Sequence, residues 1–192
     1  MDKITDVVMK PLEKSIYLKP YTMHFTQNGA KKTWDLLSVH DSVAIIVFNV
    51  TRNVLILVKQ FRPAVYLGKN GITIELCAGI VDKNLSLTEI AREEILEECG
   101  YDVPASSLHL IGSYRSGVGT SASIQTAYYC EVTDDMKVSD GGGTDDELIE
   151  VVEMTVDDIK KYVTQSCVVK SPPSFLFGIY WFLLNKAPKV NQ

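Results

Sequence analysis

The sequence predicts an α/β protein in which helices pack against a mixed β-sheet, and three observations support this. The runs at residues 43–50 and 54–61 are apolar and rich in β-branched side chains, which favours buried central strands. Ser86-Leu87-Thr88-Glu89 fits the capping box that begins a helix. Further strand-like and helix-like segments follow one another along the chain without an internal repeat or a linker. A sheet with helices against it is the architecture that this order supports.

The N-terminal part of the chain is expected to form an antiparallel hairpin. Alternating apolar residues predict a strand from Ser15 to about Phe25, and a second strand contains Trp34. Asn28-Gly29 lies between them, and both residues tolerate the positive φ of a tight hairpin turn. After the two apolar runs, residues 72–77 predict one more strand.

The capped helix is expected to run from Ser86 to Cys99, because Gly100 can adopt the left-handed conformation that ends a helix. Strands are expected near residues 108–114, 125–132 and 148–154. Thr155 is expected to cap a helix that extends to about residue 165, and Ser174 to cap an apolar helix that extends to residue 184. An acidic, glycine-rich loop at residues 134–146 precedes the last strand.

The length of 192 residues corresponds to one domain, expected at residues 15–187 between a loose arm at 1–14 and a tail at 188–192. The chain has 19 Lys+Arg against 24 Asp+Glu, a net charge of −5. This balance argues against a nucleic-acid binder or a protein held on anionic lipid, because both need a basic surface. An anionic substrate stays open, since a bound divalent metal reverses the sign of a site.

The sequence is typical of a soluble cytoplasmic protein. No two of its four cysteines have metal-ligand spacing, and reduced thiols are the expected state. Asp2, Lys3 and Asp6 interrupt the N-terminus, so no signal peptide is expected. The most apolar stretch, at residues 175–184, is too short to cross a bilayer.

Carboxylates lie on the inward face of the capped helix. At about 100° per residue, Leu87, Ile90 and Ala91 define a buried stripe. Glu94 and Glu98 fall within that stripe and Glu97 falls on its margin, whereas Arg92 and Glu93 face solvent. Two carboxylates about 6 Å apart repel by roughly 3 kcal/mol at an effective dielectric constant near 20. A cation that neutralises the cluster is therefore the favoured interpretation, and all-oxygen ligation favours Mg²⁺ or Mn²⁺ over zinc. A frayed, exposed helix end and a salt-bridged cluster are the alternatives.

The same residues resemble the Nudix box. The family pattern is Gly, five residues, Glu, seven residues, Arg-Glu, an aliphatic residue, any residue, Glu-Glu, any residue, Gly and an aliphatic residue. Counted from Gly79, the spacing matches throughout, and the residue types agree at Glu94, Ile95, Glu97, Glu98 and Gly100. Three positions depart from the pattern. Leu85 replaces the first glutamate, and Glu93 replaces the arginine, with Arg92 one residue earlier. Tyr101 replaces the last aliphatic residue.

Further segments resemble the UDP-sugar branch of the Nudix hydrolases over residues 15–187. The most specific is residues 58–66, Val-Lys-Gln-Phe-Arg-Pro-Ala-Val-Tyr. Ser116-Gly117 stands where the ADP-ribose group of the family carries a proline, which favours UDP-sugars. The resemblance implies an α/β/α sandwich and metal-dependent hydrolysis of UDP-glucose to UMP and glucose 1-phosphate. The alternatives are an ADP-ribose or broad nucleoside-diphosphate-sugar pyrophosphatase, and a nucleotide-binding module without turnover.

The resemblance also assigns roles to residues. Glu94, Glu97 and Glu98 are the expected metal ligands with the carbonyl of Ala78, and Mg²⁺ is the expected ion, with Mn²⁺ as the alternative. Arg62 is the expected phosphate contact, because a guanidinium binds two phosphate oxygens at once; a surface ion pair is the alternative.

The base and the nucleobase contacts are expected elsewhere. The candidates for a general base are Asp145, Asp146 and Glu147, with Glu147 preferred. The resemblance to dimeric family members implies a homodimer in which Tyr17 or Trp34 of one subunit stacks on uracil bound to the other. Core or interface packing is the alternative for both aromatic residues.

Overall fold

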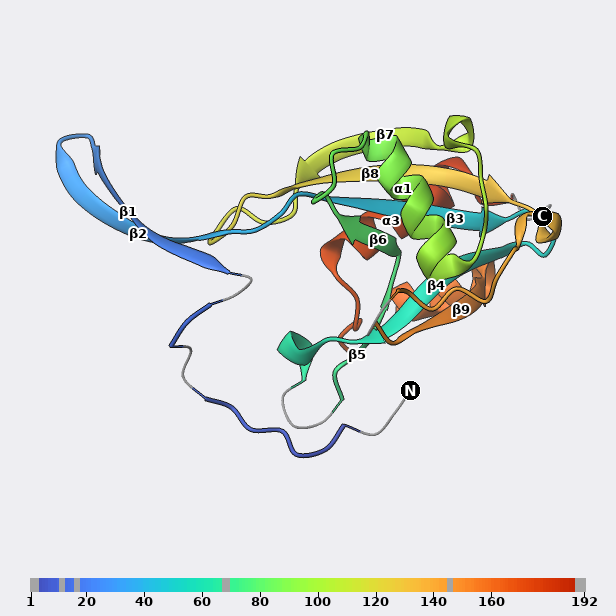
Figure 1. The fold of residues 1–192 in the computed structure, drawn as a ribbon, viewed down its shortest axis with the longest axis horizontal. Helices are drawn as coiled ribbons and strands as arrows, with labels where there is room; N and C mark the ends of the chain where they lie inside the picture. Colours follow the sequence, from blue (N-terminus) through green and yellow to red (C-terminus); the bar gives the residue numbers. More distant parts are fainter. Residues whose placement is uncertain (1–3, 11–12, 16–17, 67–69, 145–146, 189–192) are drawn as a thin grey trace.

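The computed structural model describes residues 4–10, 13–15, 18–66, 70–144 and 147–188 (Figure 1). Its strands are β1 (Lys19–Gln27), β2 (Ala30–Ser38), β3 (Ser42–Asn49), β4 (Val54–Phe61), β5 (Ile72–Glu75), β6 (Cys77–Ile80), β7 (His109–Arg115), β8 (Ile124–Val132) and β9 (Ile149–Thr155). Its α-helices are α1 (Leu87–Glu94), α2 (Val156–Val163) and α3 (Pro173–Asn185). Shorter helical turns are η1 (Pro63–Val65), η2 (Ile95–Cys99), η3 (Ala105–Ser107) and η4 (Asp134–Met136).

Within the described residues, seven strands form one mixed sheet with β3 at its centre. β3 runs parallel to β8 and antiparallel to β4, while β7 and β9 pair antiparallel with β8 and β4. The predicted mixed sheet is confirmed, and the two apolar runs are its central strands, because their side chains are buried on both faces.

The sheet splits between β3 and β4. These strands pair only from Val47↔Ile56 to Asn49↔Val54. Beyond that point β4 pairs with β5 and β3 pairs with β6, so Leu76 alone joins two short strands on opposite sides of the split. The single strand expected at residues 72–77 is therefore wrong. Its apolar composition gave no sign of the break, because both short strands and the joint are largely buried.

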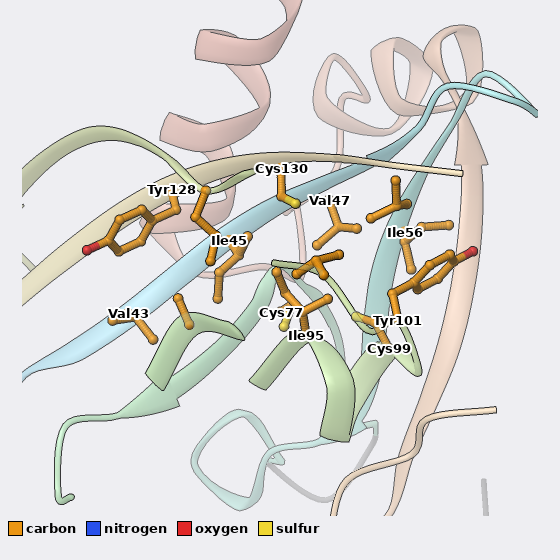
Figure 2. Packing of buried hydrophobic residues seen from close by; sticks show 14 of the residues in the cluster. Val43, Ile45, Val47, Ile56, Cys77, Ile95, Cys99, Tyr101, Tyr128 and Cys130 are labelled. Atoms are coloured by element: carbon orange, nitrogen blue, oxygen red, sulfur yellow. The ribbon is translucent and has the colours of Figure 1, made fainter. Parts of the chain in front are cut away.

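Helices cover both faces of the sheet, as in the α/β/α sandwich. Val43, Ile45 and Val47 of β3 face the core under α1 and η2, and Figure 2 shows them opposite Ile95 and Cys99. The alternate residues of β3 pack in a second core, with Phe175, Ile179 and Phe182 of α3. Figure 1 accordingly shows α1 and α3 on opposite sides of β3. The period of two along a strand places each residue in one core or the other.

The capping box at the start of α1 is confirmed. The Ser86 hydroxyl accepts a hydrogen bond from the Glu89 N–H at 3.2 Å, and Glu89 in turn accepts one from the Ser86 N–H at 3.0 Å. The end of the helix differs from the prediction: α1 ends at Glu94, and a π-helical turn, η2, continues to Cys99. Gly100 then adopts φ 80°, the left-handed conformation expected there.

Three smaller expectations were wrong. Leu87 is exposed, because at the first turn it precedes the point where the helix packs on the sheet. The first strand begins at Lys19 rather than Ser15. Ser174 does not cap α3: Pro172 occupies that position, and Pro173 has the fixed φ that suits the first helical residue.

The β1–β2 hairpin is confirmed, with Asn28 and Gly29 at positive φ in its turn. It forms a separate two-stranded sheet that projects from the body (Figure 1). In the described part of the chain, no helix is both long and apolar enough to span a membrane. All four cysteines lie in described ranges and are free thiols, and Cys167 is exposed while Cys77, Cys99 and Cys130 are buried.

Candidate active site

A cavity of about 380 Å³, called here the main cavity, opens where the sheet splits. Strands β3, β4, β5 and β6, the end of α1, η2 and the start of α3 all contribute to its wall. The wall consists of Ser42, Ala44, Gln60, Arg62, Glu75, Leu76, Ala78, Gly79, Ile80, Glu94, Glu98, Gln125, Glu147, Pro172 and Ser174. The break in pairing between β3 and β4 leaves the space, because no strand fills the gap at this end.

Glu98 is the most buried carboxylate of the cavity wall, with 4% of its surface exposed. Its Oε2 accepts a hydrogen bond from the Ala78 N–H at 2.9 Å, which joins η2 to β6. Burial raises the pKa of Glu98 to about 8, the hydrogen bond from Ala78 opposes this, and the charge of Glu94 adds to the rise. Burial and the charge of Glu97 raise the pKa of Glu94 to about 7.

Gly79 lets Glu94 lie against β6. A Cβ on Gly79 would overlap the carboxylate of Glu94, so any larger residue there would displace that side chain from its position. The glycine at the start of the box and the glutamate of the helix are therefore linked by direct steric contact.

The glycine-rich loop holds Glu147 beside the same carboxylates. The N–H groups of Gly142 and Gly143 donate to the carbonyls of Glu98 and Glu97, each at 3.0 Å. Both glycines have positive φ, at 111° and 84°, which a residue with a side chain rarely adopts. Glu147 follows in the cavity wall, and its charge contributes to the raised pKa values of Glu94 and Glu98.

Arg62 forms a two-bond ion pair with Glu75 inside the cavity. Its Nε and Nη2 donate to the two carboxylate oxygens of Glu75 at 2.8 and 2.7 Å, and the Thr73 hydroxyl donates to Glu75 Oε1 at 2.6 Å. Burial alone would raise the pKa of Glu75, but these hydrogen bonds outweigh it and lower that pKa. Nη1 of Arg62 has no hydrogen-bond partner among the described residues, so it is available to a ligand.

With this geometry in place, comparison with known proteins identifies the family. A family model described as the NUDIX domain matches residues 38–169, more than half of the chain. The chain belongs to the Nudix family.

Individual relatives agree with this assignment. Two carry the name uridine diphosphate glucose pyrophosphatase NUDT14: the Bos taurus protein is 42% identical and the Mus musculus protein 38% identical, each over 100% of this chain and 99% of the relative. A GDP-mannose pyrophosphatase of Yersinia enterocolitica is 33% identical over 79% of this chain and 81% of the relative. Nudix hydrolases generally use divalent metal ions.

The donor set of this Nudix chain fits a divalent cation. Glu94 is half-buried and Glu98 is buried, the charge of Glu94 raises the pKa of Glu98, and oxygen ligands are those that Mg²⁺ prefers. Across the described ranges, however, no three acidic, His or Cys side chains already lie close enough to hold an ion. Binding therefore requires the carboxylates to turn toward one another. Asp145 and Asp146 lie outside the described residues.

Glu97 lies beside the main cavity rather than in its wall. Its charge raises the pKa of Glu94, so the two carboxylates are neighbours. Glu93, which replaces the arginine of the Nudix box, forms an ion pair with Lys83 at 2.7 Å and does not line the main cavity. Arg92 is not simply solvated as expected: its Nε donates to the Val103 carbonyl at 2.9 Å and its Nη2 to Asp102 at 2.8 Å. It secures α1 to the segment that follows η2.

Trp34, one of the two aromatic candidates, does not line the main cavity of its own chain. Trp34 is 56% exposed on the hairpin, and its Nε1 donates to the Gly119 carbonyl at 2.8 Å. Tyr17 lies outside the described residues.

Glu75 and Gln125 are polar residues of the cavity wall that were not predicted as site residues. Glu75 is a charged residue with 7% exposure in an otherwise apolar segment, and that position in the sequence was a usable signal. Gln125, at the start of β8, has no comparable signal, because a polar residue at the end of a strand is common.

Proposed function

We propose that this chain is a divalent-metal-dependent hydrolase that cleaves UDP-glucose to UMP and glucose 1-phosphate. The observation that carries the proposal is that Glu94, Glu98 and Glu147 line the same cavity as the guanidinium of Arg62. A diphosphate needs positive charge near several of its oxygens. In this cavity Arg62 supplies one positive charge, and the carboxylates attract a metal ion that supplies more. The full-length similarity to UDP-glucose pyrophosphatases supports the choice of nucleotide sugar.

Glu94, Glu97 and Glu98, with the carbonyl of Ala78, would hold the ion, and we propose Mg²⁺, with Mn²⁺ as the alternative. The ion supplies charge neutralisation of the diphosphate and activation of water when bound. Glu97 supports this set because it neighbours Glu94 and needs only to turn inward.

Arg62 would orient the diphosphate and Glu147 would accept the proton of the attacking water. Glu75 holds the guanidinium plane of Arg62, so Nη1 would bind a phosphate oxygen with less loss of side-chain entropy. Water then adds across the P–O–P bridge: one phosphorus gains the new oxygen, and the other keeps the bridging oxygen. Glu147 suits the role of base because it is exposed at the cavity and attached to a glycine-rich loop.

We further propose a cytoplasmic homodimer in which Trp34 of the hairpin, or Tyr17, contacts the uracil of the partner's substrate. The hairpin supports this because it projects from the body (Figure 1), and its residues Tyr21, Met23 and Trp34 are each at least half exposed. The free thiols fit a reducing compartment.

The test is a substrate panel with purified protein and Mg²⁺. UDP-glucose, GDP-mannose and ADP-ribose are compared by kcat/KM, and UMP and glucose 1-phosphate are quantified from the first. The proposal predicts the highest kcat/KM for UDP-glucose. The similarity to GDP-mannose pyrophosphatases makes GDP-mannose the second candidate substrate. A higher kcat/KM for GDP-mannose or for ADP-ribose would contradict UDP-glucose as the substrate. Folded protein that binds UDP-glucose without cleaving it would identify a binding module instead.

A further inference from the structure

A second cavity, called here the side cavity, adjoins the main one beside the start of α3. Its volume is about 330 Å³, and it shares Gln125, Pro172 and Ser174 with the main cavity. Tyr114 and Phe177 line it as well. This volume is within the roughly 300–1,000 Å³ of small-molecule sites. A ligand whose diphosphate lies in the main cavity therefore reaches the side cavity across Gln125.

A row of three polar residues crosses the sheet at this boundary. Gln125 of β8 lies opposite Ser42 of β3 and opposite Tyr114 of β7. The Tyr114 hydroxyl donates to Gln125 Oε1 at 3.1 Å, and Gln125 Nε2 donates to Ser42 Oγ at 3.2 Å. Both ends of the Gln125 amide are thus bonded, so the side chain is held in place between β7 and β3.

The fixed amide leaves hydrogen-bonding capacity for a ligand. Nε2 of Gln125 has a second N–H, and the hydroxyl of Ser42 has its own proton to donate. The hydroxyl of Ser174 has no hydrogen bond to another described residue. Gln125 and Ser174 line both cavities, and Ser42 lines the main cavity next to Gln125.

An apolar surface completes the side cavity. The rings of Tyr114 and Phe177 lie 4.7 Å apart at 57°, and Phe177 is 42% exposed. Pro172 lies in the wall beside them. A hexose matches this combination, because its C–H faces pack on aromatic rings while its hydroxyls take neutral donors and acceptors. The wall also includes Arg115, whose Nη1 donates to the Ala122 carbonyl and whose other N–H groups are further donors for sugar hydroxyls.

We infer that the side cavity binds the hexose of the nucleotide sugar and that Gln125 is a specificity-determining residue, held in orientation by Tyr114. The inference rests on the proposed function. It assigns the two halves of the substrate to different places, with the diphosphate between Arg62 and the carboxylates and the hexose beyond Gln125.

The test compares inhibition by the two products. Hydrolysis of UDP-glucose is measured with added glucose 1-phosphate or added UMP for the wild type, Gln125→Leu and Tyr114→Phe. Loss of one hydrogen bond corresponds to about a fivefold change in binding. We expect the KM for UDP-glucose and the inhibition constant of glucose 1-phosphate to rise by about that factor in Gln125→Leu. The inhibition constant of UMP is expected to stay unchanged.

Tyr114→Phe keeps the ring on Phe177 and removes only the bond to Gln125, so it is expected to shift the same constants in the same direction by less. It also keeps the test decisive if Gln125→Leu does not fold. Ser113→Ala is the matched control: Ser113 precedes Tyr114 on β7 and bonds Thr126 outside both cavities. Thermal melting verifies that each variant is folded.

Two results would overturn the inference alone: an unchanged inhibition constant for glucose 1-phosphate in both variants, or a rise in the constant for UMP instead, which would assign the nucleoside to this cavity. A wild-type protein that does not cleave UDP-glucose would overturn the proposed function and the inference together.

Discussion

The main-chain N–H of Ala78 donates to the carboxylate of Glu98 at 2.9 Å, and this bond joins the split edge of the sheet to the end of the Nudix helix. One short strand and one π-helical turn thereby position a carboxylate that is 4% exposed. Burial favours the neutral form of Glu98, so its negative charge does not stabilise the fold without a bound cation. A buried acid with this preference is useful to the protein when a cation binds.

Glu98→Gln separates function from folding. The amide keeps an oxygen that accepts from Ala78 and removes the buried charge, so we expect thermal stability in EDTA at alkaline pH to equal or exceed that of the wild type. We expect kcat with Mg²⁺ to fall by at least about 100-fold, because one metal ligand is lost. Wild-type activity of Glu98→Gln would remove this residue from the site.

The metal-free protein is expected to lose stability as the pH rises through the pKa values of Glu94 and Glu98, about 7 and about 8. Both values lie above those of the unfolded chain, so the folded state binds more protons in this range and is stabilised at lower pH. Thermal melts in EDTA across this range measure the effect, and added Mg²⁺ should restore stability at the alkaline end. The double variant Glu94→Gln, Glu98→Gln is the control, and its melting temperature should depend less on pH. Equal pH dependence in the two proteins would contradict the raised pKa values.

Gly79→Ala tests the contact between β6 and the helix. The new Cβ would overlap the carboxylate of Glu94, which is half-buried and able to move away. We expect a loss of about 1–3 kcal/mol in the free energy of unfolding and a higher Mg²⁺ concentration for half-maximal activity. Gly119→Ala is the matched control, because a Cβ there meets no atom within 4 Å. An unchanged Mg²⁺ requirement in Gly79→Ala would mean that the position of Glu94 does not govern metal binding.

Arg92→Ala is expected to affect stability and not catalysis. Arg92 bonds Val103 and Asp102 and does not line the main cavity. Loss of these bonds should lower the free energy of unfolding by about 1 kcal/mol, which urea titration measures, with kcat unchanged. A large loss of kcat would instead show that Arg92 replaces the arginine that Glu93 displaces in the Nudix box.

The elements governed by local rules were predictable from the sequence. The capping box at Ser86, the left-handed Gly100 and the Asn28-Gly29 turn each depend on a few adjacent residues, and each is present. The β3 and β4 strands followed from their apolar composition. The break at Leu76 did not, because strand pairing with two different neighbours is a property of the whole sheet.

The same division holds for the candidate site. Glu94 and Glu98 share the inward face that helical periodicity predicts, and Glu97 lies at its margin. The partner of Arg62 is Glu75, thirteen residues away on another strand, and the partners of Gln125 are on β3 and β7. Contacts between distant strands depend on register, which periodicity within one segment does not give.

The most direct test is the stoichiometry of UDP-glucose cleavage by the wild type and Glu98→Gln, each with Mg²⁺ and with EDTA. The proposal predicts equal amounts of UMP and glucose 1-phosphate from the wild type with Mg²⁺, and almost none in the other three reactions. Products other than this pair, cleavage in EDTA, or equal rates for the two proteins would contradict a metal-dependent diphosphate hydrolase centred on these carboxylates.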